Sequence, residues 1–260
     1  ELYRAVDSLP GIKKSFIGSG VRYDLLLHKS KDENTNRAAR EYTRELIARH
    51  VSGRLKVAPE HTSDKVLNLM RKPPFSQFGD FKRIFDRINS EEGLNQQIIP
   101  YFISSHPGCA EEDMAELAVI TKKLDFHLEQ VQDFTPTPMT ISTETWYTGY
   151  DPYTLEPVTS AKTPREKLAQ RQFFFWYKPE ERASIEKELR RIGRADLIEQ
   201  LYEGMPKPYV KDYRKQERQD GQWRQQPTKR KSFNPNFNND NKRPKDKGRK
   251  NPANSRGRKP

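Results

Sequence analysis

The sequence predicts an α/β fold in which helices cover a parallel sheet. Short apolar runs begin near residues 14, 54, 97 and 130, and a longer helical pattern follows each of them. These intervals are typical of repeated strand–helix units. A closed eight-stranded barrel needs roughly 200 residues or more, so four units within 1–134 form either an open sheet or the second half of a barrel.

The first two units begin with strands expected at 14–18 and 54–58. The helix expected over 37–51 carries apolar residues every three or four positions, which is the period of a helix with one buried face. After the second strand, Thr62 or Ser63 is a suitable first residue for a helix. A hydroxyl there can accept a hydrogen bond from a free backbone N–H of the first turn.

The third and fourth units begin with strands expected at 97–103 and 130–134. Residues 75–88, which precede the third strand, repeat phenylalanine and isoleucine at helical spacing. Between these strands a helix is expected over 111–124. Its first turn is acidic, as the positive end of the helix dipole favours.

A second region, 135–205, begins where the composition changes to Pro, Thr, Tyr and Gly. The change indicates a long ordered arm, followed by helices expected at 164–177, 180–192 and 194–202. A third region, 206–260, has little to bury and is expected to be a disordered basic tail. The tail holds 18 of the 48 Lys+Arg and 5 of the 36 Asp+Glu, leaving 30 and 31 in residues 1–205. The net charge of +12 is therefore a property of the tail.

Composition also excludes several classes of protein. No run of about 18 apolar residues is present, so the sequence predicts no membrane span, and no apolar signal segment opens the chain. Cys109 is the only cysteine. The chain alone therefore cannot form an intrachain disulfide, a zinc ribbon or an iron–sulfur cluster held by several thiolates. A reducing, cytoplasmic location is expected.

Polar segments follow all four expected strands, and active sites of parallel strand–helix folds lie beyond such strand ends. The segments are 18–24, 58–62, 104–109 and 135–138. A dinucleotide loop is rejected at the first one, because Tyr23 stands where the third glycine would be. Gly18 and Gly20 instead allow either a tight turn or a close approach to a ligand. Arg22 suits a carboxylate or phosphate ligand, or an ion pair with Asp24 or Glu60.

Four residues at neighbouring strand ends could hold a metal by type, but their spacing matches no recognised metal signature. They are Glu60, His61, His106 and Cys109. An acid–base role for a histidine or glutamate is favoured over a metal site. Cys109 has no evident base, so a structural thiol is favoured over a nucleophile. A barrel enzyme without a cluster that uses Glu60 and His106 is less favoured, because half a barrel offers no closed pocket.

These segments resemble the radical SAM superfamily, and closely its YgiQ-type subgroup. The matching stretches are Phe16-Ile-Gly-Ser-Gly-Val-Arg-Tyr-Asp24, Leu55-Lys-Val-Ala-Pro-Glu-His-Thr-Ser-Asp64 with Leu67 and Met70-Arg-Lys72, Ile99-Pro-Tyr-Phe-Ile-Ser-Ser-His-Pro-Gly108 with Glu112-Asp113-Met114, and Gln130-Val-Gln-Asp-Phe-Thr-Pro-Thr-Pro-Met-Thr140. Cys109 stands where the broader superfamily has glutamate, a departure associated with this subgroup. The family's Cys-x-x-x-Cys-x-x-Cys loop and glycine-rich loop belong to earlier strands, which this chain lacks.

The resemblance implies that 1–134 is the second half of a partial TIM-like (β/α) barrel, followed by a helical C-terminal region and the tail. The parent enzyme would pass an electron from a 4Fe-4S cluster to S-adenosylmethionine, and the resulting 5′-deoxyadenosyl radical would abstract hydrogen from an unknown substrate. It would need a one-electron donor, and this chain alone would be inactive. By position, the candidate cofactor-binding residues are Ser19, Arg22, Glu60, His61, Ser104 and His106. No catalytic residue and no metal ligand is assigned to this chain.

An alternative function is binding of RNA or another nucleic acid through the tail. Basic residues there alternate with rings, which suits stacking on single-stranded bases. They are Trp223, Arg224, Lys229, Arg230, Lys231, Phe233 and Phe237. A solvated tail without a fixed partner is the competing interpretation. A nucleic-acid role would reside in 206–260 and weaken with salt, whereas an enzyme role would reside at the strand ends.

Overall fold

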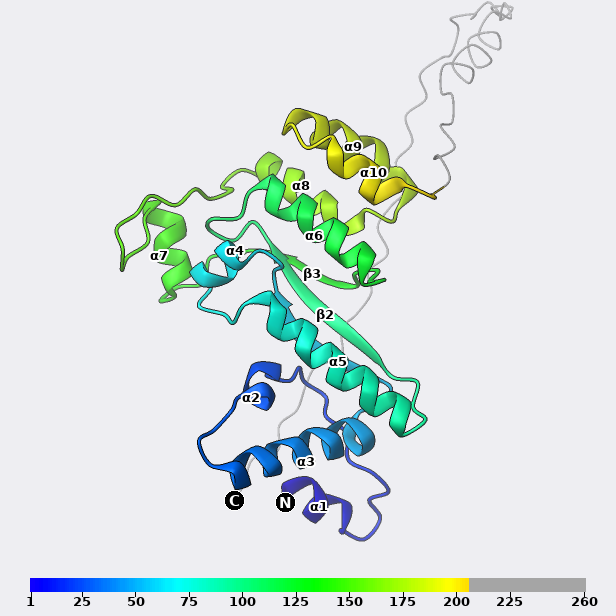
Figure 1. Ribbon diagram of the computed structural model, residues 1–260. Coiled ribbons are helices and arrows are strands. Elements are labelled where there is room, and N and C mark those ends of the chain that lie inside the picture. The colour runs from blue at the N-terminus through cyan, green and yellow to red at the C-terminus, as the bar shows by residue number, and fades with distance from the viewer. Residues whose placement is uncertain (206–260) are drawn as a thin grey trace, which may run out of the picture. The chain divides into compact units, whose positions relative to one another are not determined.

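The computed structural model describes residues 1–205 (Figure 1). The expected tail, 206–260, and its suggested RNA contacts lie outside the described residues. The described part is a mixed α/β fold around a three-stranded parallel sheet in the order β1-β2-β3. The strands are β1 (Arg54–Glu60), β2 (Gln97–Ser104) and β3 (Gln130–Asp133). The expectation of a parallel sheet covered by helices is confirmed.

Side chains of alternating character place one face of the sheet against helices. In β1, Leu55 and Val57 are buried, whereas Arg54 and Lys56 are exposed. Successive side chains of a strand point to opposite faces, so this pattern gives β1 an apolar side and a polar side. The helix α3 (Glu33–His50) leads into β1, and three helices connect the strands: α4 (Asp64–Leu69), α5 (Phe75–Glu91) and α6 (Glu111–Lys123).

Two apolar clusters form the core on the helical side. The first joins the sheet to α3 and α5, and its members include Ile47, Leu55, Val57, Phe78, Phe81, Phe85 and Ile98. The second joins Phe102 and α6 to the C-terminal helices, with Met114, Leu117, Phe173, Phe174, Ile185, Leu189 and Leu201 among its members. These C-terminal helices are α8 (Pro164–Arg171), the 3₁₀ helix η1 (Gln172–Phe175), α9 (Pro179–Arg191) and α10 (Asp196–Tyr202). They share a core with α6 and so lie against the strand–helix units.

The strand expected at 14–18 does not form, and that prediction is wrong. Phe16 is 48% exposed, and the N–H of Ile17 donates to the carbonyl of His50 at the end of α3 (2.8 Å) rather than to a strand. Only Val21 makes a single parallel bridge to Val57. A Cβ on Gly20 would lie 3.4 Å from the carbonyl oxygen of Lys56, so this glycine lets the backbone run against β1.

Three short helices were not expected from the sequence: α1 (Leu2–Asp7), α2 (Tyr23–Leu27) and α7 (Ile141–Thr148). The last of these lies inside the expected arm. Thr140 caps it by accepting a hydrogen bond from the N–H of Thr143, and Gly149 ends it in the left-handed conformation. The helix expected over 164–177 is instead divided between α8 and η1.

The other face of the sheet is mixed in character. It exposes the side chains of Arg54, Lys56, Gln97 and Gln132, and the strand register places Ile99 and Ile103 on the same face. Within residues 1–205, no helix combines the length and the apolar character needed to cross a membrane.

Candidate functional site

A pocket of about 330 Å³ lies at the carboxyl ends of the three strands. Each strand and the segment after it contribute to its lining. The residues that matter below are Glu60, Lys72, Tyr101, His106, Gln132 and Asp133. This is the edge at which parallel strand–helix folds place their ligands.

Glu60 brings a carboxylate into this pocket from a strained position. Its φ is +67°, in the left-handed region that residues other than glycine seldom adopt, and a bulge interrupts the pairing of β1 with β2 just before it. Its side chain is 13% exposed and forms an ion pair with Lys72 (3.1 Å). The other oxygen, Oε2, is buried and has no hydrogen-bond donor among the described residues. Glu60 therefore has one unpaired oxygen enclosed at the wall of the pocket.

His106 contributes a neutral imidazole. Its Nδ1 lies 2.9 Å from the carbonyl oxygen of Pro107, which can only accept, so Nδ1 carries the proton. Its Nε2 then accepts from the hydroxyl of Ser142 in α7 (2.9 Å). Burial lowers the pKa of His106, while the Pro107 carbonyl opposes this effect. The edge of the ring faces Phe134 with a centroid separation of 5.1 Å.

Tyr101 and Gln132 pair with each other in the pocket, whereas Asp133 pairs with residues outside its lining. The hydroxyl of Tyr101 donates to Oε1 of Gln132 (2.5 Å), and burial and the charge of Glu60 raise the pKa of that phenol. Asp133 accepts from the hydroxyl of Ser104 (2.6 Å) and from Nη1 of Arg171 in α8 (3.2 Å). Ser104 itself is fully buried beneath this pair and is not part of the pocket lining.

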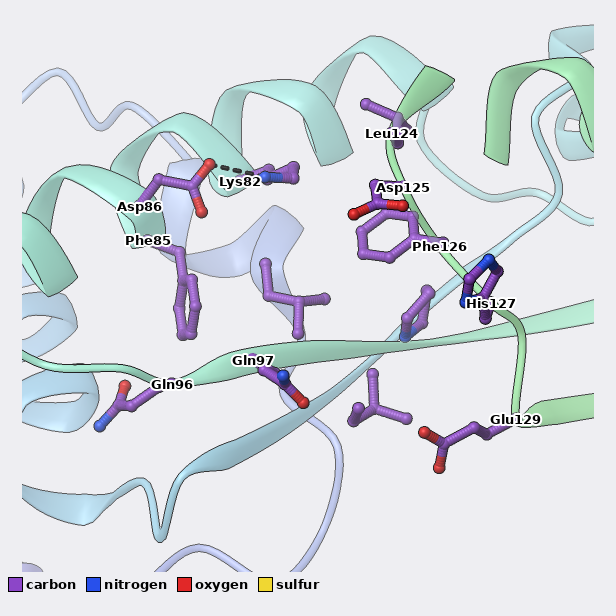
Figure 2. Close-up of a pocket in the computed structure, with 13 residues that line it drawn as sticks. Lys82, Phe85, Asp86, Gln96, Gln97, Leu124, Asp125, Phe126, His127 and Glu129 are labelled. Carbon is purple, nitrogen blue, oxygen red and sulfur yellow. Dashed lines mark hydrogen bonds and ion pairs between the residues drawn. The ribbon is translucent and has the colours of Figure 1, made fainter. Parts of the chain in front are cut away.

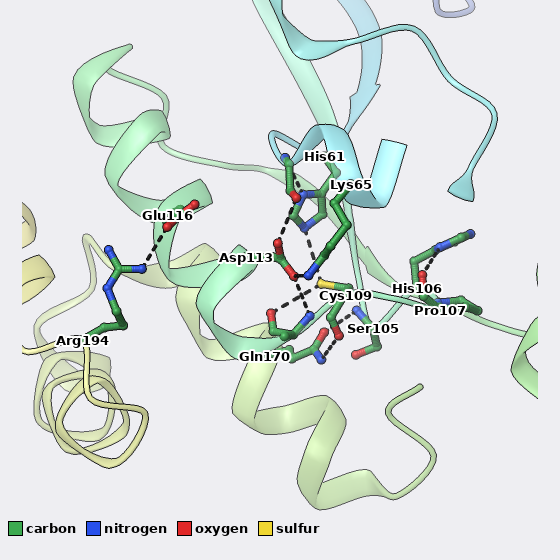
Figure 3. A network of polar contacts seen from close by, with 12 residues as sticks. His61, Lys65, Ser105, His106, Pro107, Cys109, Asp113, Glu116, Gln170 and Arg194 are labelled. Carbon is green, nitrogen blue, oxygen red and sulfur yellow. Dashed lines mark hydrogen bonds and ion pairs between the residues drawn. The ribbon is translucent and has the colours of Figure 1, made fainter. Parts of the chain in front are cut away.

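His61 and Cys109 form a second polar group, which lies inside the protein (Figure 3). The backbone N–H of Ser63 donates to Nδ1 of His61 (3.0 Å), so Nε2 carries the hydrogen and faces Sγ of Cys109 at 3.5 Å. Burial lowers the pKa of His61 to about 4 and raises the pKa of the thiol far above its usual value. Both groups are therefore neutral near pH 7, and neither lines the pocket.

The structure does not bring the first predicted segment into the pocket. Ser19 is exposed, and Arg22 is exposed and paired with Asp24 through two contacts of 2.8 and 2.6 Å. The expected strand that would have aimed both residues at the sheet edge is absent. Of the six candidates, only Glu60 and His106 line this pocket.

Several lining residues were not predicted from the sequence. Lys72 belongs to one of the matching stretches but had no assigned role, and Ser142 lies on α7, which was expected to be an irregular arm. Gln132 is exposed between the half-buried Val131 and Asp133 in β3, and the alternation of Gln130, Val131 and Gln132 in the sequence could have identified it as facing away from the helices. Within the described residues, no three His, Cys, Asp or Glu side chains gather as a metal site would require.

Another pocket, of about 430 Å³, lies near the amino end of β2 (Figure 2). It is bounded by α5 and by the segment that leads from α6 into β3. Lys82 and Asp86 of α5 face each other there and form an ion pair of 2.7 Å. This end of a parallel sheet is not where such folds place their ligands, so the pocket at the carboxyl ends is the better candidate.

Comparison with known proteins gives one family and several close relatives. The family model described as "Domain of unknown function (DUF3362)" matches residues 129–259. A "UPF0313 protein" of Bacteroides thetaiotaomicron is 79% identical over 202 residues, covering 78% of this chain and 33% of the relative. The "UPF0313 protein" of Porphyromonas gingivalis is 67% identical over 203 residues, which cover 78% of this chain and 32% of that relative. The chain therefore spans about a third of the length of the curated relatives it matches.

Proposed function

The chain belongs to the DUF3362 family, a domain family of unknown function. We propose that this chain is part of a radical SAM enzyme. In this proposal residues 1–134 are the second half of a partial barrel. Their strand ends form one wall of the site for S-adenosylmethionine and substrate. The resemblance in the four strand-end segments supports the proposal, and the greater length of the UPF0313 relatives leaves room for the first half.

The observation that carries the proposal is the pocket at the carboxyl ends of the strands, which Glu60 and His106 line. The neighbouring sheet face exposes Arg54, Lys56, Gln97 and Gln132 and also carries Ile99 and Ile103. A face with several exposed polar side chains suits the lining of a barrel interior that holds a polar ligand.

S-adenosylmethionine fits the groups that the pocket offers. It would supply, when bound, the 5′-deoxyadenosyl radical for hydrogen abstraction. Oε2 of Glu60 is buried without a donor, and it can accept a hydrogen bond from a ligand hydroxyl or amine once the side chain turns toward the pocket, while Lys72 balances the charge of the carboxylate. His106 presents a neutral ring that Ser142 orients.

An iron–sulfur cluster does not fit the described residues. Cys109 is 3% exposed, and burial raises the pKa of its thiol, whereas clusters are held by thiolates. In this proposal the cluster ligands belong to another part of the protein, and no step of the reaction is assigned to the cluster here.

The test is the affinity of the full-length protein for S-adenosylmethionine, measured by isothermal titration. Glu60→Gln removes the charged acceptor, and we expect about tenfold weaker binding, since a hydrogen bond to a charged group contributes about 1.5–3 kcal/mol. Glu129→Gln is the matched control, because Glu129 is exposed just before β3 and pairs with Arg54. Equal affinity of both variants and the wild type would remove Glu60 from the site.

A further inference from the structure

The loop between β2 and α6, residues 105–109, is held from three positions in the region that the DUF3362 model matches. Ser142 of α7 donates to His106 (2.9 Å). The carbonyl of Thr159 accepts from the N–H of Gly108 (2.8 Å). Gln170 of α8 makes the third attachment. The loop carries His106 into the pocket, so its conformation decides where that ring lies.

Gln170 closes the loop from inside the protein (Figure 3). Its side chain is buried, with the residue 3% exposed. Its Oε1 accepts from the N–H of Ser105 (2.8 Å), and its Nε2 donates to the carbonyl of Cys109 (2.8 Å). One carboxamide thus satisfies the backbone at both ends of the loop, where buried N–H and carbonyl groups need partners.

These two hydrogen bonds matter because the backbone of the loop is strained. Ser105 has a φ of +61°, in the left-handed region that is unfavourable for a residue with a side chain. Strain of this kind persists only where surrounding contacts hold it. The hydroxyl of Ser105 is buried and has no partner among the described residues, so it does not hold the turn. Its backbone N–H does have a side-chain partner, since it donates to Oε1 of Gln170.

We infer that Gln170 is a positioning residue that holds Ser105 in the left-handed conformation, and that the DUF3362 region serves to fix this loop at the mouth of the pocket. The inference deepens the proposed function, on which it rests for the role of the pocket. The loop geometry itself does not depend on that function. The test therefore measures how readily the loop opens and does not measure the reaction.

Cys109 provides the measurement. It is buried at the end of the loop, so a thiol reagent reaches it only when the loop opens. In the full-length protein, mass spectrometry of the peptide that contains Cys109 follows its labelling separately from that of any other cysteine. Gln170→Met keeps the volume of the side chain and removes both hydrogen bonds. We expect Cys109 to react at least about tenfold faster in this variant.

Gln172→Met is the matched control. Gln172 is also buried, 7% exposed, but its hydrogen bonds go to Ala169 (2.9 Å) and Ser184 (2.7 Å), away from the loop. This variant should lower the melting temperature without speeding the reaction of Cys109. Equal labelling rates in Gln170→Met and Gln172→Met would overturn the inference.

A rescue separates positioning from general packing. Glycine adopts a positive φ without strain, so Ser105→Gly added to Gln170→Met should return the labelling rate toward that of the wild type. Ser105→Ala removes the same hydroxyl, keeps the strain and should not rescue. Rescue by both or by neither would overturn the inference. If Gln170→Met does not fold, Gln170→Leu takes its place with the same predictions, because leucine also lacks both the acceptor for Ser105 and the donor to Cys109.

Discussion

Burial decides the charge of the histidines near the pocket. His61 is completely enclosed, and burial lowers its pKa to about 4 from an ordinary value of 6.5. Its partners, the N–H of Ser63 and the thiol of Cys109, suit a neutral ring. A proton added to this ring would leave a buried charge with no counter-ion in direct contact.

The stability of the protein should therefore depend on pH through His61. As the pH falls from about 6.5 to 4, the unfolded chain binds a proton that the folded His61 does not, so the free energy of unfolding falls. Between pH 6.5 and 5 this contribution is about 2 kcal/mol. Urea unfolding at both values should show a correspondingly larger loss for the wild type than for His61→Asn. Equal losses in the two proteins would contradict the burial argument.

Gly108 is a position where only glycine fits. Its φ is +82°, and an added Cβ would overlap the Leu69 side chain and touch Val158. Gly108→Ala should lower the free energy of unfolding by about 2–4 kcal/mol, from backbone strain together with overpacking. Gly193→Ala is the control, because Gly193 has a φ of +75° and open space around it, and should cost only about 1 kcal/mol. Similar losses at both positions would show that the overlap relaxes without cost.

At the scale of elements, the sequence predicts the strands and helices whose apolar residues recur at regular spacing. It misses the elements that depend on contacts between residues far apart in the sequence. The strands β1, β2 and β3 and the helices α5 and α6 have regular apolar periods, and their predicted bounds agree with the structure to within a few residues. Residues 14–18 have no strand partner, and the nearest bridge to the sheet is made by Val21, after this segment. The helix α7 has little periodicity and depends on its cap at Thr140 and its end at Gly149.

The start of α6 is joined to the start of α4 by Asp113. Its carboxylate accepts from Lys65, from the hydroxyl of Ser63 and from the N–H of Ala110, each at 2.8 Å. Although burial alone would raise it, these hydrogen bonds hold the pKa of Asp113 below its ordinary value. Asp113→Asn should therefore cost about 2 kcal/mol of unfolding free energy.

Chemical denaturation would measure this cost. Glu116→Gln, on the same helix, is the control, since Glu116 is 54% exposed and its pair with Arg194 should contribute about 0.5 kcal/mol. A loss at Asp113 no larger than that at Glu116 would mean that the two helix starts are not coupled through the carboxylate.

At the scale of the whole molecule, the sequence predicts where the site lies more accurately than it predicts which residues line the pocket. Parallel strands bring their carboxyl ends to one edge, which is why Glu60 and His106 meet at one pocket. The left-handed backbone conformation of Glu60 and the burial of His61 directly after it are not evident from the sequence. Both depend on how the chain packs against α4 and α6. Ser142 and Asp133 reach the pocket through contacts between segments far apart in the sequence.

If the chain is one part of a larger enzyme, it should be inactive when purified alone. We expect anaerobic reconstitution of the 260-residue chain to give no stoichiometric iron or sulfide and no cleavage of S-adenosylmethionine, because Cys109 is its only cysteine and is buried. Iron and sulfide analysis after gel filtration is the measurement. Recovery of a stable cluster on this chain would contradict the assignment of the ligands to another part of the protein.

The most direct test of the proposed function is whether the full-length protein forms 5′-deoxyadenosine. The protein should be reconstituted anaerobically with iron and sulfide, supplied with S-adenosylmethionine and a strong one-electron reductant, and analysed by chromatography. The account predicts 5′-deoxyadenosine and methionine in equal amounts, with slower formation in Glu60→Gln at unchanged iron content. A fully loaded protein that forms no 5′-deoxyadenosine would contradict the assignment to radical SAM chemistry.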